Sequence, residues 1–498
     1  MRKSVWILTA LLWFAASSGA AAWSFPTSRV AFPGAVGFGA TAKGGRGGDV
    51  YHVTNLADSG AGSLREGIET ALGARTIVFE VGGTIDLQSP LRISAARLTI
   101  AGQTAPGGIG LRGYPVVLSG AEDVVLRYLR LRPGDRNAQA ARGRPGRGNA
   151  DLPADAADAL SIFDSRRVIV DHVSASWGMD ETLSVTNSRA VTVQHSIISE
   201  SLDDSYHPEG PHGYGSLLRG LGGRGYSFFG NLYAHHVLRS PAVGGEETPP
   251  PGEERRGLDI EFVNNVIYDW GLLSSHTVEG LGRMRVNYHA NVLVAGPRTF
   301  CRICVFTVLD PDPADRLSIH RAGNWIDAQP NGVFDPEPAP DFSFFGVMEL
   351  VDEPFRFGNS RIDALPALRA YDRVLREAGA SLSRDEVDRR VIRQVFEQSG
   401  GIIDSQDQVG GWPADPPPRP PPTDGDRDGM ADPWECRMGL DPEKPEDRNR
   451  FDLSLRYTNL EIYLQHLVSP DQGGLELRHR HRPWRRGGRR PSCKAWSE

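Results

Sequence analysis

The sequence predicts an all-β protein, a right-handed parallel β-helix, and three observations lead to this fold class. Short runs rich in β-branched and aromatic residues, bounded by turn formers, follow one another from about residue 31 to 327. Similar runs recur at a step of 23 residues, as between Val168 and Val191. A step of this size with variable insertions is typical of a solenoid. No helical pattern separates the runs, so helix-linked parallel strands are disfavoured.

Asparagines after four of these runs are expected to stack inside the coil. They are Asn231, Asn265, Asn291 and Asn324, in the contexts GNLY, NNVIY, ANVLV and GNWID. Stacked side-chain amides can hydrogen-bond to turn backbone that would otherwise be buried without partners. The alternative is a β-sandwich with four unrelated turn residues, which four similar contexts disfavour.

Composition agrees with a large, turn-rich protein. The 498 residues suffice for a large core and more than one domain, and 57 glycines and 36 prolines favour many turns. The net charge of -7 disfavours nucleic acid as a partner. We expect a monomer.

Residues 1–22 are predicted to be a signal peptide. A short basic start, MRK, precedes an apolar stretch and a cleavage region of small residues near Ala20 or Ala22. No later stretch is apolar for long enough to cross a bilayer. The mature protein is therefore expected to be secreted, or periplasmic, with no membrane partner.

The predicted β-helix domain spans residues 23–363, and four segments follow it. Residues 364–412 carry apolar positions at helical spacing and are expected to pack on the solenoid or cap its end. Residues 413–422 form a proline-rich linker, and residues 423–467 form a small module. The basic tail, 468–498, is expected to be disordered, with polyanion attachment as the alternative reading.

The small module contains an EF-hand-like calcium loop, DGDRDGMADPWE. Acidic residues occupy loop positions 1, 3, 5, 9 and 12, namely Asp424, Asp426, Asp428, Asp432 and Glu435. Gly429 stands at position 6, where the loop turns sharply. An acidic linker, the alternative, would not produce this spacing. The later stretch FDLSLRYTNLEIYL has apolar residues at the early ligand positions, so we do not expect it to bind calcium.

A second acidic group follows from the 23-residue step. If successive coils stack about 4.8 Å apart, equivalent residues lie above one another. One edge of the solenoid would then carry Asp158, Asp180, Glu181, Asp203, Asp204 and Arg239. Stacked carboxylates repel one another unless a cation lies between them, and hard oxygen ligands favour calcium. The alternative is a set of separately solvated turn residues.

The chain resembles the bacterial pectate lyases of polysaccharide lyase family 1 over roughly residues 31–357. The likeness rests on the motifs FPGAVGFGATAKGGRGGDVYHVTNLADSGAGSLREGI, RTIVFEVGGTIDL, LTIAGQTAPG, LRYLRLRPGD, DALSI, VDHVSASWGMDETLSV and NLYAHHVLRSP. The resemblance implies calcium-dependent β-elimination of an acidic pectic polysaccharide, polygalacturonate.

The resemblance also implies roles for particular residues. Asp158 in DALSI matches a calcium-ligand position, and MDETLSV, with Asp180 and Glu181, matches a segment that supplies further ligands. Arg239 in RSP matches the catalytic arginine of the family. The chain departs from the family at Gly244, where a second arginine often stands. It also lacks a lysine before the catalytic strand, where Arg219 is the nearest cation and the candidate substrate-binding residue.

Arg239 is an unusual general base because an arginine side chain has a pKa of about 13. We therefore expect activity that rises into alkaline pH. The competing bases are His235 and His236, which we interpret as core or stacking residues. His207 and His212 are further candidates for residues that line the cleft.

Two other functions stay open at this point. A non-catalytic, polysaccharide-binding β-helix would use calcium for structure only. A β-helix glycoside hydrolase would use paired carboxylates as acid and base, and these resemble a calcium cluster in sequence.

Cys301 and Cys304 form a C-x-x-C pair, for which a disulfide is the simplest interpretation in an exported chain. A zinc site would need a second ligand pair nearby, and a redox motif would need a βαβ context.

Overall fold

The computed structural model describes residues 29–470 except 221–224, 245–257, 279–281, 310–315, 359 and 361, and also describes residue 493. The expected signal peptide and most of the basic tail lie outside the described residues. No helix in the described part is both long and apolar enough to cross a membrane.

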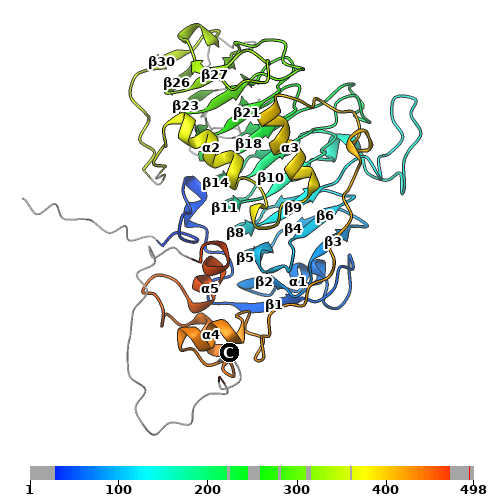
Figure 1. The fold of residues 1–498 in the computed structure, drawn as a ribbon, viewed down its shortest axis with the longest axis vertical. Helices are drawn as coiled ribbons and strands as arrows, with labels where there is room; N and C mark the ends of the chain where they lie inside the picture. The colour runs from blue at the N-terminus through cyan, green and yellow to red at the C-terminus, as the bar shows by residue number, and fades with distance from the viewer. Residues whose placement is uncertain are drawn as a thin grey trace, which may run out of the picture.

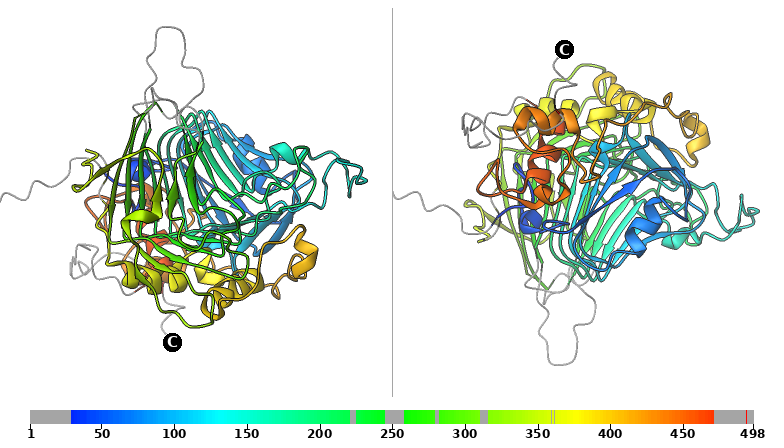
Figure 2. Two further views of the ribbon diagram at one scale, coloured as in Figure 1. Left: turned by 90° about the horizontal axis from the view of Figure 1, so that it is seen from above. Right: turned by 90° about the horizontal axis from the view of Figure 1, so that it is seen from below.

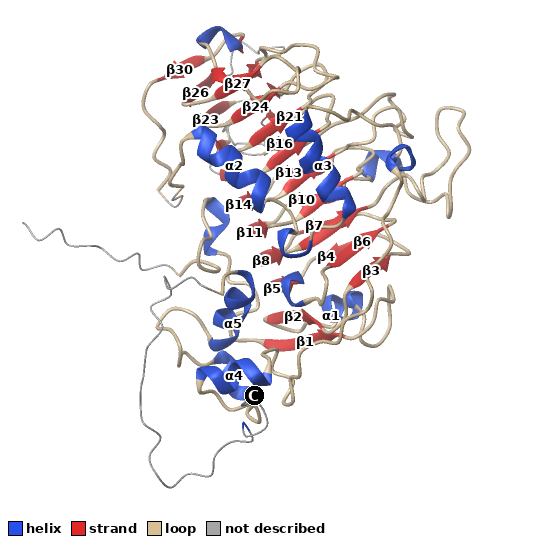
Figure 3. Ribbon diagram, in the orientation of Figure 1, coloured by secondary structure: helices blue, strands red, loops and turns tan. Residues whose placement is uncertain are grey.

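Three long sheets form the body of the molecule, and the chain visits them in a repeating order (Figures 1 and 3). We name them sheet A, with 11 strands, sheet B, with 10, and sheet C, with 9. Between the two ends of the molecule, each coil contributes one strand to A, then B, then C. Strand neighbours are parallel except for the last pair of sheet B. This arrangement is the right-handed parallel β-helix predicted from the sequence.

The strands of sheet A are β1 (Asp49–Val53), β2 (Arg75–Phe79), β5 (Ala96–Ala101), β8 (Glu122–Arg127), β11 (Arg166–Asp171), β14 (Arg189–Gln194), β17 (Gly225–Phe229), β20 (Asp259–Val263), β23 (Arg283–His289), β26 (Arg316–Ala322) and β30 (Glu349–Val351). The strands of sheet B are β3 (Gly83–Asp86), β6 (Ile109–Arg112), β9 (Leu129–Arg132), β12 (Ser174–Ser176), β15 (Ile197–Ser199), β18 (Leu232–Ala234), β21 (Val266–Tyr268), β24 (Val292–Val294), β27 (Trp325–Asp327) and β28 (Glu337–Pro338). The strands of sheet C are β4 (Leu91–Ile93), β7 (Val116–Ser119), β10 (Leu160–Phe163), β13 (Leu183–Thr186), β16 (Leu217–Arg219), β19 (Ala242–Gly244), β22 (Ser275–Thr277), β25 (Phe306–Thr307) and β29 (Phe344–Phe345). The α-helices are α1 (Leu64–Glu69), α2 (Ala367–Glu377), α3 (Glu386–Glu397), α4 (Asp432–Met438) and α5 (Asn459–Val468).

The 23-residue step appears as strand register. Val168 pairs with Val191 in sheet A, and Leu160 pairs with Leu183 in sheet C. These side chains are fully buried and belong to one core that fills the interior of the coil. In the next coil Val193 pairs with Phe228, a step of 35 residues. The additional residues form a loop between β15 and β16, and this loop reaches the candidate site.

The four asparagines form the expected ladder at one corner of the coil. The Asn265 Oδ1 accepts hydrogen bonds from the backbone N–H of Asn231, at 2.9 Å, and from its side-chain amide, at 3.0 Å. The same pattern links Asn265 to Asn291 and Asn291 to Asn324. All four are buried, so the ladder satisfies backbone groups that water does not reach.

Helices α2 and α3 lie along the outside of sheet B (Figures 1 and 2). Their apolar faces pack against residues of β15, β18, β21 and β24 in a second buried cluster. Two buried ion pairs add to this packing, because Arg132 contacts Asp388 at 2.7 Å and Arg390 contacts Glu200 at 2.9 Å. The helices therefore cover the side of the solenoid rather than an end.

The C-terminal module packs against the first coils of the β-helix (Figure 2). Trp434 of α4 and Leu460 of α5 share a buried cluster with Ala101, and Val50 packs against it. Polar contacts join the same surfaces, including an Arg46–Glu461 ion pair at 2.7 Å. The proline-rich segment before the module is mostly exposed and has no regular structure.

Two disulfides join the four cysteines. Cys301 pairs with Cys304, as expected, and Cys436 of α4 pairs with Cys493.

Candidate active site

The candidate catalytic residues lie on one row of turns, where each coil passes from sheet B to sheet C. Asp158 precedes β10, Glu181 precedes β13 and Arg239 precedes β19. Glu181 is aligned with Tyr214 of the next coil, and Tyr214 is aligned with Leu238. Because parallel coils stack in register, residues far apart in sequence meet on this row.

Asp158, Asp180 and Glu181 form a compact carboxylate cluster, with one oxygen from each lying within 4.8 Å of the others. The Asp158 carboxylate accepts hydrogen bonds from the backbone N–H of Glu181, at 3.1 Å, and from the Ser161 hydroxyl, at 2.9 Å. Asp158 and Glu181 are buried, and the Asp180 side chain is 20% exposed. The structure thus brings together the three residues predicted to hold a metal.

Electrostatic strain within the cluster is large. Burial, and then repulsion from Glu181, raises the pKa of Asp180 to about 9. Burial, and then repulsion from Glu181 and Asp180, raises the pKa of Asp158 well above its usual value. Three close carboxylates beside Arg239 therefore need protons or a cation. This donor set of hard oxygens fits calcium.

Arg239 stands beside the cluster and is held from several sides. Its guanidinium hydrogen-bonds to Glu181 and lies 4.3 Å from the centroid of the Tyr214 ring. Its backbone is in the left-handed region, with φ of 63°, and its carbonyl accepts a hydrogen bond from the Ser216 N–H at 2.6 Å. The side chain is 21% exposed, so it is positioned yet accessible to a substrate.

Asp203 and Asp204 do not join the row, which corrects the register prediction. They lie in the loop between β15 and β16, and Tyr214 takes the position next to Glu181. Asp204 pairs with Arg142 and Arg144, and these arginines hold its pKa below its usual value. The 23-residue step failed here because it could not show that this coil is longer.

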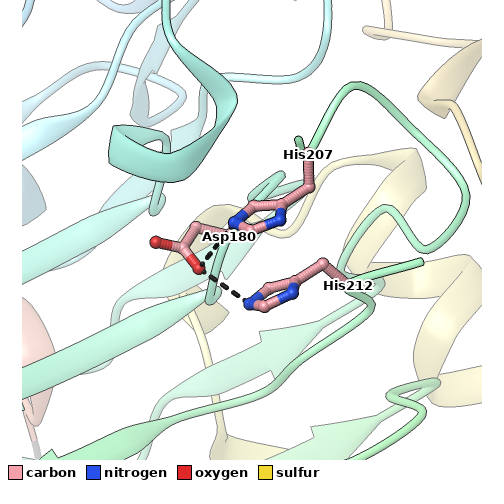
Figure 4. A group of neighbouring side chains, drawn as sticks. All are labelled: Asp180, His207 and His212. Carbon is pink, nitrogen blue, oxygen red and sulfur yellow. Dashed lines mark ion pairs between the residues drawn. The ribbon is translucent and has the colours of Figure 1, made fainter. Parts of the chain in front are cut away.

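His207 and His212 come from the same loop and face Asp180 (Figure 4). Their rings stack at 3.6 Å, and their Nε2 atoms lie 3.7 Å and 3.1 Å from one Asp180 oxygen. Burial lowers the pKa of His212 to about 4. These two imidazoles form one wall of the carboxylate cluster and lie closer to it than the sequence alone indicated.

His235 and His236, the competing bases, are core residues. His235 contacts Asp269 at 2.8 Å and Gln394 at 3.2 Å through its two ring nitrogens. His236 contacts the Ser201 hydroxyl at 2.7 Å and a backbone carbonyl at 3.0 Å. Both are at most 1% exposed, so neither can take a proton from a polysaccharide.

A groove of about 310 Å³ adjoins Arg239 and is lined by residues of β16 and β22. Arg219, the candidate substrate-binding residue, lines it together with Arg239. Arg219 is the strand partner of Gly244, one coil away. The cation that the sequence lacks at residue 244 is therefore present at the same register position of the neighbouring strand.

The acidic loop of the C-terminal module forms a second candidate metal centre. Asp424, Asp426 and Asp428 form one close group, and Asp428, Glu435 and Asp447 form another. Burial and mutual repulsion raise the pKa of Asp428 to about 8 and that of Glu435 to about 9. Buried oxygens of Asp426, Asp428, Glu435 and Asp447 have no hydrogen-bond partner in the described residues. These unpartnered oxygens fit a bound cation.

The centre differs from the EF-hand prediction at two residues, Asp432 and Asp447. Asp432 lies outside both groups, and its carboxylate accepts a hydrogen bond from the Gly425 N–H at 2.7 Å. Asp447, which no loop spacing indicated, takes part instead. It lies twelve positions beyond Glu435 in sequence and reaches the loop only through the folding of the module.

Tyr214 was also missed by sequence reasoning. It lies in GPHGYGS, where glycines hide any strand pattern, and only its alignment between Glu181 and Leu238 reveals its place.

Comparison with known proteins places the chain among fungal relatives rather than the bacterial enzymes that the motifs indicated. No family model matches it. It is 36% identical over 450 residues to a probable pectate lyase C of Aspergillus flavus, covering 89% of this chain and 95% of the relative. A probable pectate lyase C of Emericella nidulans is also 36% identical, over 447 residues.

Among solved structures, the cedar pollen allergen jun a 1 has a similar fold, with a TM-score of 0.50 and 18% identity. The match covers 69% of this chain and 92% of the allergen. Since identity to the curated relatives exceeds one third along almost the whole chain, this polysaccharide lyase belongs to the pectate lyase family.

Proposed function

We propose that the chain is a secreted pectate lyase that cleaves polygalacturonate by calcium-assisted β-elimination, with Arg239 as the base. The observation that carries this proposal is the position of Arg239 between a buried carboxylate cluster and an arginine-lined groove. The names of the relatives support the substrate, and the signal peptide predicted from the sequence supports the location.

In this mechanism Arg239 takes the proton from C5 of a galacturonate residue. The C5–H electron pair forms the C4–C5 double bond, the C4–O bond breaks, and the leaving oxygen takes a proton from water. Glu181 and Tyr214 hold the guanidine in place. Calcium held by Asp158, Asp180 and Glu181 would supply positive charge beside the substrate carboxylate, where negative charge develops. Arg219 offers a second positive charge along the groove.

The test is product chemistry with polygalacturonate and calcium. The proposal predicts an ultraviolet-absorbing unsaturated uronate, and Arg239→Ala should lower kcat by about 10²–10⁴-fold. Arg166→Ala is the matched control, because Arg166 is a surface arginine with a side chain 57% exposed. Retained fold, checked by circular dichroism, makes the comparison valid.

The same assay separates the alternatives. New reducing ends without the ultraviolet band would indicate a glycoside hydrolase. An absence of product from every pectin tested would favour a polysaccharide-binding protein. Full activity of the Arg239→Ala variant would remove the base assignment.

We also propose that the C-terminal module binds a second calcium ion for structure rather than catalysis. Asp424, Asp426, Asp428, Glu435 and Asp447 supply the oxygens. No part of this centre belongs to the row of turns that carries Arg239.

A further inference from the structure

The groove beside Arg239 has features that the proposed reaction does not use. It lies over the outer face of sheet C, toward β22 and β25, whereas the carboxylate cluster lies toward β10 and β13. Its volume of about 310 Å³ is at the lower end for ligand pockets. A polysaccharide that reaches Arg239 along the axis of the β-helix would therefore pass from the cluster into the groove.

His276 of β22 lines the groove, and one of its ring nitrogens is buried without a partner among the described residues. Its Nδ1 lies 2.7 Å from the Thr277 carbonyl oxygen, which can only accept a hydrogen bond, so Nδ1 carries the proton. Nε2 is then a lone-pair acceptor in the neutral ring, and it has no partner within the part of the chain that the structure describes. The side chain is only 4% exposed. A buried acceptor without a donor costs free energy, and a ligand hydroxyl would remove that cost.

The ring is neutral under ordinary conditions. Burial, opposed by the hydrogen bond to Thr277 and aided by the charge of Arg239, lowers the pKa of His276 to about 4. His276 therefore acts as an acceptor for a neutral donor and not as a partner for a carboxylate.

A second unpartnered atom stands next to it. Thr307 of β25 is the strand partner of His276, and its buried Oγ1 also has no partner among the described residues. On the other side of His276, its strand partner is Ala242 of β19. Two unpartnered polar atoms in adjacent coils are what a hydroxyl-rich ligand lying along the axis would satisfy.

We propose that this groove is a sugar-binding subsite, in which His276 accepts a hydrogen bond from a ring hydroxyl of a galacturonate residue adjacent to the one that Arg239 attacks. This inference rests on the proposed function. Arg219 and Arg239, which line the groove, select the acidic ring by charge, while His276, which also lines it, selects the ring by a hydroxyl group. His276 is thus a specificity-determining residue and takes no part in proton transfer.

The test is the kinetics of two variants on a series of oligogalacturonates of increasing length. His276→Leu removes the acceptor, and we expect KM to rise about five- to thirtyfold on chains long enough to fill the groove, with kcat changed less than about threefold. His276→Gln keeps an acceptor near the position of Nε2 and should restore most of the affinity. Short chains that end before the groove should show no difference. His289→Leu, on sheet A, is the matched control.

Three results would overturn the subsite. These are an unchanged KM in His276→Leu on every chain length, an equal rise on short and long chains, and failure of His276→Gln to restore affinity although it is folded. If the wild-type protein forms no unsaturated product, the proposed reaction fails, and calorimetric titration with hexagalacturonate decides the subsite alone. Weaker binding in His276→Leu than in the wild type would then support it, and equal or absent binding would overturn it.

Discussion

At the scale of single residues, the candidate site depends on how the backbone of Arg239 is held. A left-handed conformation is unfavourable for a non-glycine residue, and the neighbouring coil stabilises it. Gly215 and Ser216 run beside it, and both use their N–H groups on the segment that carries Arg239. Gly215, which belongs to another coil, therefore helps to position the guanidinium of Arg239.

Gly215→Ala should lower kcat by about 10–100-fold while the protein stays folded. The added Cβ would lie 2.5 Å from the Arg239 carbonyl oxygen and 3.1 Å from a ring carbon of His236, so the segment must shift. Small displacements of a catalytic group are costly in rate. Steady-state kinetics on polygalacturonate measures the effect. Gly73→Ala, where nothing lies within 4 Å of the new atom, is the control, and an equal loss there would contradict the argument.

At the scale of elements, helix α3 is attached to the solenoid by charge as well as by packing. Asp385, its N-cap residue, accepts a hydrogen bond from the Asp388 N–H at 3.1 Å and also pairs with the buried Arg132. Burial opposes ionisation of Asp385, but Arg132 outweighs it and lowers the pKa of Asp385 to about 2. The attachment is therefore sensitive to acid.

Acid should loosen α3 before it unfolds the solenoid. Because the folded pKa of Asp385, about 2, is below the unfolded value of about 3.9, its contribution is present above pH 3.9 and lost as the pH falls through 2. Hydrogen exchange of α3 between pH 5 and pH 2 measures this. Asp385→Asn keeps a capping side chain but loses the charge, so its exchange should depend less on pH in that window. An unchanged pH dependence would refute the role of this pair.

At the scale of the whole molecule, the C-terminal module and the β-helix form a continuous structure. Gly429 of the acidic loop has a φ of 91°, and a Cβ there would lie 3.1 Å from Val50 of β1. His52 of the same strand contacts the Arg427 carbonyl at 3.0 Å. The candidate calcium loop therefore packs directly on β1, the first strand of the solenoid. An ordered loop is expected to stabilise this end of the β-helix.

Calcium removal should destabilise this end of the molecule. With free calcium at about 100 times the Kd, binding to the folded module contributes about 2.7 kcal/mol. Glu435→Gln should abolish most of that gain, raise hydrogen exchange in α4, α5 and β1, and leave kcat at saturating calcium nearly unchanged. Glu446→Gln, an exposed residue of the same module, is the control. Asp158→Asn should give the opposite pattern, with activity lost and the module intact.

Local sequence patterns specified a large part of this protein. Runs rich in β-branched and aromatic residues and a 23-residue step predicted the β-helix, because such runs form strands and each coil must repeat the last. The same step brought Asp158 and Glu181 together, and the asparagine contexts predicted the ladder. The spacing of acidic residues predicted most of the second carboxylate centre, because all its candidate ligands except Asp447 lie within one loop.

Tertiary structure decided what the repeat could not specify. The longer coil between β14 and β17 moved Asp203 and Asp204 away and placed Tyr214 beside Glu181, since register depends on insertion length and not on local pattern. Arg219 came to lie next to Gly244, and His276 next to Arg239, only through pairing between coils. Nothing in the sequence indicated how the module docks either, because its apolar residues meet those of β1 and β5 from distant parts of the chain. The Asn449–Gly48 hydrogen bond, between residues 401 positions apart, illustrates this separation.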